Sequence, residues 1–109
     1  MSVRFSRSTG ALAIASSVAP KQSFQLEEVR VHLSGVGGAG DLTLSVNSGA
    51  GAVYDAVLVT QDMTALADYF YLPSKPLQFQ KGDEIDVVWA NAGTKTYGVE
   101  IVWRGTGPS

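Results

Sequence analysis

Apolar and polar residues alternate along much of the chain with a period of two, which is typical of β-strands with one buried face. Residues 42–46 are the simplest case, because Leu42, Leu44 and Val46 alternate with threonine and serine. In residues 24–33 the alternation changes phase near Glu27 and Glu28, which predicts a register shift or a β-bulge there. Both segments are therefore predicted to be strands that bury one face.

Further strands are expected where short runs rich in β-branched or aromatic residues end at turn residues. These runs cover residues 53–60, 69–72, 77–79, 84–91 and 97–104. Trp89 and Trp103 alternate in phase with aliphatic neighbours, so we expect both side chains in the core. Only residues 61–67 show some helical preference, enough for a single turn that Asp62 or Thr64 could cap.

About seven or eight short strands separated by turns predict an all-β chain that forms a single antiparallel β-sandwich or jelly roll. We place this sandwich at residues 23–105, an extended N-terminal arm at residues 1–22 and a C-terminal tail at residues 106–109. The arm is too poor in Leu, Val and Phe for a signal peptide, despite its basic start. We expect it to pack on a neighbouring subunit, with a loosely held first strand as the alternative.

The stretch Ser-Gly-Val-Gly-Gly-Ala-Gly-Asp at residues 34–41 contains a literal G-x-G-x-x-G, formed by Gly35, Gly37 and Gly40. That fingerprint binds a dinucleotide only when a helix begins after the last glycine. Here the alternation of residues 41–46 predicts a strand instead. We therefore interpret the stretch as a hairpin loop whose lack of side chains suits close contact with another surface.

Composition narrows the function classes further. The 109 residues carry a formal charge of -2, which provides no cationic field for nucleic acid, and no apolar run is long enough to span a membrane. The chain has no cysteine and one histidine, His32, so disulfides, thiolate metal sites and multi-histidine metal sites are excluded. We expect no cofactor and no metal.

Three groups of residues are candidates for a chemical site. Asp83, Glu84 and Asp86 place three carboxylates in four residues, but their spacing matches no EF-hand loop and a solvated turn is expected, with calcium left open. His32 on a strand could serve a hydrolase, which is the weakest hypothesis because no nucleophile motif accompanies it. Tyr69 and Tyr71 share a strand face and would form a contact patch, or a platform for sugar rings, if Phe70 and Leu72 fill the core.

The second half of the chain carries a resemblance. Residues 53–62, 76–91 and 96–103, which include Val-Tyr-Asp-Ala-Val-Leu-Val-Thr and Lys-Gly-Asp-Glu-Ile-Asp-Val-Val-Trp, are similar to small β-sandwich virion proteins of tailed bacteriophages. The resemblance implies a non-enzymatic, jelly-roll-like subunit that decorates or cements the capsid. It implies binding to the major capsid protein and to copies of itself, on the capsid surface of a virion produced in the bacterial cytoplasm.

The residues expected at such interfaces lie in the arm, the glycine loop and the tyrosine pair. They are Val3, Phe5, Leu12, Ile14, Val18, Gly37, Gly38, Tyr69 and Tyr71. The alternative function is a tail, fibre or receptor-binding module that recognises carbohydrate. No nucleic-acid or membrane partner is expected.

Overall fold

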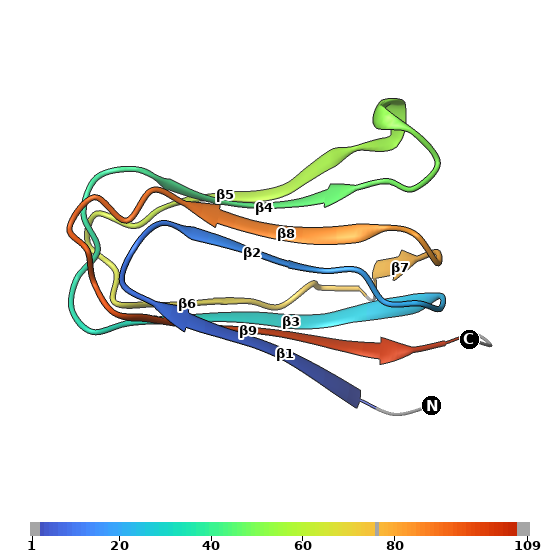
Figure 1. Cartoon of the computed structure of the whole chain (residues 1–109), viewed down its shortest axis with the longest axis horizontal. Helices are drawn as coiled ribbons and strands as arrows, with labels where there is room; N and C mark the ends of the chain where they lie inside the picture. Colours follow the sequence, from blue (N-terminus) through green and yellow to red (C-terminus); the bar gives the residue numbers. More distant parts are fainter. Residues whose placement is uncertain (1–2, 76, 107–109) are drawn as a thin grey trace.

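The computed structural model describes residues 3–75 and 77–106, which form two antiparallel sheets packed face to face (Figure 1). Sheet A has the order β1-β9-β3-β6, with β7 also paired to β3, and sheet B has the order β2-β8-β4-β5. The strands are β1 (Val3–Gly10), β2 (Ile14–Val18), β3 (Phe24–Leu33), β4 (Asp41–Asn47), β5 (Ala56–Asp62), β6 (Asp68–Tyr71), β7 (Leu77–Phe79), β8 (Glu84–Trp89) and β9 (Tyr97–Gly105). One short 3₁₀ turn, η1 (Ala52–Tyr54), precedes β5.

The strand pairing is nested along the chain. β1 pairs with β9, β2 with β8, β3 with β6 and β7, and β4 with β5. When β6 and β7 are taken as one interrupted strand along the same edge of β3, this is a long antiparallel ribbon rolled into two sheets, which is the jelly-roll arrangement. The predicted fold class, an all-β antiparallel sandwich, is therefore confirmed.

The N-terminal residues are part of this sandwich. β1 forms the edge of sheet A, where it pairs with β9 from Val3 to Gly10, and β2 forms the edge of sheet B. The Ser8 and Ser16 hydroxyls, 2.5 Å apart, join the two edges. The separate arm predicted for residues 1–22 is thus not what residues 3–22 form, and the alternative of a first strand describes Val3–Gly10 better. Of the predicted tail, Thr106 donates its N–H to the Ser23 carbonyl, and residues 107–109 lie outside the described residues.

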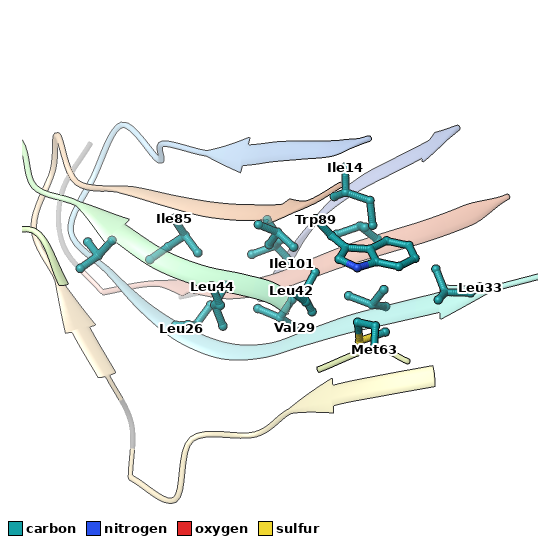
Figure 2. Close-up of a cluster of buried hydrophobic side chains, with 14 of the residues drawn as sticks. Ile14, Leu26, Val29, Leu33, Leu42, Leu44, Met63, Ile85, Trp89 and Ile101 are labelled. Atoms are coloured by element: carbon teal, nitrogen blue, oxygen red, sulfur yellow. The ribbon is translucent and has the colours of Figure 1, made fainter. Parts of the chain in front are cut away.

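The core lies between the sheets and is almost entirely aliphatic, with Trp89 as its largest side chain (Figure 2). Trp89 is 1% exposed and Trp103 packs against the same cluster, as predicted from the alternation. Ile14 from β2 and Met63 from the loop after β5 are fully buried and complete the cluster. Burying side chains of this size stabilises the fold by about 1.5–3 kcal/mol each.

The hairpin predicted at residues 34–41 is wrong. β3 and β4 lie in different sheets, and so do β8 and β9, so the glycine loop and the turn at residues 92–95 both cross from one sheet to the other. The alternation identifies which face of a strand is buried. It does not identify the sheet to which the strand belongs, because both sheets bury one face. Residues 63–67 form a turn without a helix, and Asp62 caps it by accepting from the Thr64 N–H and hydroxyl.

The predicted irregularity in β3 is confirmed, because the register with β9 shifts between Leu26 and Glu28. This bulge lets Phe24 and Leu26 point inward on one side of it and Val29, Val31 and Leu33 on the other. Within residues 3–75 and 77–106, no helix has the length and apolar character required to cross a lipid bilayer.

Candidate functional site

Four connections between the sheets gather at one end of the sandwich, on the left of Figure 1. They are residues 11–13, 34–40, 63–67 and 90–96, and we call this surface the loop end. Two large apolar side chains are exposed there: Leu12 by 77% and Val36 by 54%. Exposed apolar side chains mark a surface that binds other proteins where they form a contiguous patch.

Asn91 joins the loop of residues 90–96 to the loop of residues 11–13. It is 2% exposed, and its Nδ2 donates to the carbonyls of Leu12 and Lys95 while its Oδ1 accepts from the Lys95 N–H. Next to it, the Ser34 N–H donates to the Thr96 carbonyl. Leu12 is therefore carried by a loop held by the buried Asn91, and Val36 by a loop held through backbone hydrogen bonds of Ser34 and Gly37.

The glycine loop packs on its own chain. Gly37 is buried, its N–H donates to the Leu66 carbonyl, and a Cβ at this position would lie 2.5 Å from the Met63 carbonyl oxygen. Gly38 is half-buried, and a Cβ there would meet only the Gly93 nitrogen at 3.8 Å. Gly37 is thus used for close packing within the chain, whereas Gly38 leaves room at the surface.

The outer face of sheet A carries a ladder of ion pairs. Arg7 and Arg30 both bind Glu100, Arg30 also binds Glu28 at 2.9 Å, and Arg104 binds a further carboxylate, that of Glu27, at 2.7 Å. The hydrogen bond from Arg7, reinforced by Arg30, lowers the pKa of Glu100. The hydrogen bonds of Arg30, first that with Glu28 and then that with Glu100, raise the pKa of Arg30. Networked pairs of this kind hold side chains in fixed positions even where each pair stabilises the fold little.

A hollow of about 620 Å³ lies on this face. Two rows of side chains line it across the strands in the order β1, β9, β3, β6. The first row is Thr9, Gly98, His32 and Asp68, and the second is Arg7, Glu100, Arg30 and Phe70. A Cβ added to Gly98 would contact no other part of the chain within 4 Å. The backbone of the central strand β9 at Gly98 therefore forms the floor of the hollow.

His32 and Asp68 form a hydrogen-bonded pair in the wall of the hollow. The His32 Nδ1 donates to Asp68 Oδ1 at 2.5 Å, which leaves Nε2 directed away from the carboxylate. The nearest hydroxyl in the same row is Thr9, two strands away, or about 10 Å at the usual strand spacing. A nucleophile must lie within hydrogen-bond reach of its base, and Thr9 lies outside that reach of His32.

The residues predicted at interfaces fall into two groups. Val3, Phe5 and Leu12 are exposed by 42%, 50% and 77%. The others belong wholly or partly to the chain's own interior: Ile14 and Gly37 are buried, and Val18, Gly38, Tyr69 and Tyr71 are half-buried. Ile14 and Gly37 therefore have no surface to offer another chain.

The prediction for the tyrosine pair is wrong in its orientation. Tyr69 and Tyr71 pair with Val31 and Val29, whose side chains are in the core, and both tyrosines pack against that core. Phe70 is instead exposed by 57% on the outer face. Burial raises the pKa of Tyr69, with a smaller contribution from Tyr71.

In the acidic turn at residues 83–86, backbone N–H groups bind the carboxylate of Asp83. Asp83 accepts hydrogen bonds from the backbone N–H groups of Gly49 and Gln80, so its carboxylate holds two turns together. On the outer face of sheet B, burial raises the pKa of Asp86 to about 6, aided by a hydrogen bond with Glu84 and by the charges of Glu84 and Asp55. No group of three or more potential metal ligands is found among the described residues.

Comparisons with known proteins give little further information. No family model matches the sequence, and no curated protein matches it. Among solved structures, the chain is similar to Yersinia pseudotuberculosis-derived mitogen, with a TM-score of 0.40 and 13% sequence identity over 99% of this chain and 89% of the mitogen. A similarity of this degree identifies neither a family nor an activity for this chain.

Proposed function

We propose that this protein is a bacteriophage virion subunit that decorates the capsid by binding the major capsid protein through the loop end. The observation that carries the proposal is the exposure of Leu12, on a loop held by the buried Asn91, and of Val36, on a loop held by backbone hydrogen bonds. A pre-ordered apolar surface binds without the entropic cost of ordering its loops. The small jelly roll and the sequence resemblance to phage virion proteins support the same role.

Contacts between copies of the chain are part of this proposal. β1 is an edge strand of eight residues, and among residues 3–75 and 77–106 no strand of sheet A pairs with its outer side. Val3 and Phe5 are exposed beside that edge. Unpaired edges with apolar side chains favour pairing with another chain. Light scattering should give a mass of at least twice the 11.5 kDa of one chain. A monomer at high protein concentration would exclude self-association.

Co-sedimentation with undecorated capsids tests the docking surface. Purified wild-type protein should pellet with the capsids at a saturating stoichiometry. The double variant Leu12→Ser, Val36→Ser should bind at least tenfold more weakly, because each substitution removes apolar area from the contact. Val88→Ser is the matched control, since Val88 is 50% exposed on the outer face of sheet B.

Equal binding by the double variant and the control would exclude the loop end as the docking surface. Absence of saturable binding by the wild-type protein would overturn the decoration role itself. Because both substituted side chains are more than half exposed, the variants are expected to fold. Loss of binding can therefore be assigned to the lost contact, provided that their unfolding curves match the wild-type curve.

A further inference from the structure

The hollow on the outer face of sheet A adjoins the loop end but shares no lining residue with it, and docking on a capsid does not explain the hollow. Its floor is Gly98, the second residue of β9, which pairs with Thr9 of β1 and His32 of β3. Glycine inside a strand weakens the strand and frequently marks a place where a ligand approaches the backbone. The space above Gly98 is open, so the absence of a side chain there creates room that the chain itself does not fill.

The wall formed by Phe70 supplies an exposed aromatic surface. Phe70 is 57% exposed at the edge of the hollow, on β6. Its cross-strand neighbour Arg30 is held by Glu28 and Glu100 and contributes fixed polar groups beside the ring. An aromatic face with a negative centre packs well on C–H groups that carry partial positive charge. The C–H face of a pyranose ring is such a surface.

The remaining walls supply hydrogen-bonding groups of both kinds. The His32 ring keeps Nε2 available, since its Nδ1 is bound to Asp68, and Glu100 and Asp68 provide carboxylate oxygens. The cations and anions of the walls are largely paired with one another, so the hollow has no strong excess of either charge. A neutral ligand rich in hydroxyl groups, which both donate and accept, matches this arrangement better than an ion.

We propose that this hollow binds the ring of a neutral hexopyranose, with Phe70 against its C–H face and the ring seated over Gly98. The site is shallow and its ligand is small, so a single sugar ring should bind with a dissociation constant on the order of millimolar. Several copies of the chain displayed together would bind a polymeric glycan more tightly through multivalency. The proposal is independent of capsid docking.

Saturation-transfer NMR on the full chain tests the proposal with methyl glycosides of glucose, galactose, mannose and N-acetylglucosamine. At least one of them should give a saturable signal with the wild-type protein. Gly98→Leu should abolish the signal by filling the hollow, and Phe70→Ala should weaken binding about tenfold. Leu72→Ala is the matched control, because Leu72 is 66% exposed just beyond β6 and does not line the hollow.

The three variants distinguish binding in the hollow from binding elsewhere on the chain. A signal that is lost in Gly98→Leu, weakened in Phe70→Ala and unchanged in Leu72→Ala supports the site. Absence of a saturable signal with all four glycosides, or a signal that persists in both Gly98→Leu and Phe70→Ala, would overturn it. Should Gly98→Leu fail to fold, the comparison of Phe70→Ala with Leu72→Ala alone separates the two results.

Discussion

Two adjacent glycines in the same loop have different roles in the structure. Gly37 is buried against the loop after β5, where any side chain would collide with the Met63 carbonyl. Gly38 is half-buried and has free space around it. Neither residue has a positive φ, so backbone strain does not distinguish them. The difference lies entirely in packing.

Alanine at these two positions should therefore have unequal effects. Gly37→Ala forces a Cβ against a backbone oxygen 2.5 Å away, which should lower the free energy of unfolding by about 1–3 kcal/mol. Gly38→Ala should change it by about 0.5 kcal/mol or less. Urea unfolding of both variants is the measurement. Equal destabilisation would show that the loop does not pack on Met63 as described.

At the scale of elements, the alternation of residues predicted the strands well because burial of one face is a local property. It also predicted the bulge between Leu26 and Glu28, where the phase changes. It did not predict that β3 and β4, or β8 and β9, belong to different sheets. The sheet to which a strand belongs depends on how all the strands pair along the chain. The sequence of a single strand does not contain that information.

The candidate site was less predictable than the fold. In β6 both faces carry large apolar or aromatic side chains, so alternation could not decide between Tyr69 and Phe70. The register with Val29 and Val31 decides it in the structure. The hollow brings together residues from four strands that are far apart in sequence. Its only local signal was Gly98, a glycine inside an otherwise regular strand.

The position of residues 3–18 as edge strands predicts the effect of a deletion. Removing residues 1–22 takes one strand from each sheet and removes Ile14, which is fully buried. Losing a buried isoleucine alone costs about 2–5 kcal/mol, against a typical total stability of about 5–15 kcal/mol. The truncated chain should lose cooperative urea unfolding, whereas Leu12→Ser should retain it. A truncated chain that unfolds cooperatively would restore the separate arm.

Asp86 should make stability depend on pH through sheet B. Burial raises its pKa from the ordinary 3.8 to about 6 in the folded chain, so the folded state binds its proton more tightly than the unfolded state. The resulting stabilisation is complete below about pH 4 and is lost as the pH rises through about 6. Asp86→Asn cannot ionise and lacks this loss.

The free energy of unfolding of Asp86→Asn, measured relative to wild type, should therefore increase between pH 4 and pH 7. Urea unfolding at both pH values provides the comparison. Asp83→Asn serves as a contrast, because Asp83 accepts backbone hydrogen bonds and its substitution should destabilise at neutral pH. An offset for Asp86→Asn that is the same at both pH values would contradict the assignment.

At the scale of the whole molecule, the two outer faces differ in charge. All four arginines lie on β1, β3 and β9 of sheet A, whereas the strands of sheet B carry carboxylates and no lysine or arginine. The apolar side chains of the loop end lie at one end of both sheets. A subunit built this way can bind a shell by its end and leave two chemically distinct faces for neighbours or ligands.

A reconstruction of the virion, or of capsids incubated with the purified protein, would show where the subunit sits on the shell. We expect jelly-roll density on the outer surface of the shell, with the loop end, and hence Leu12 and Val36, against the major capsid protein. Particles without this density, or density with the loop end directed away from the shell, would contradict this expectation.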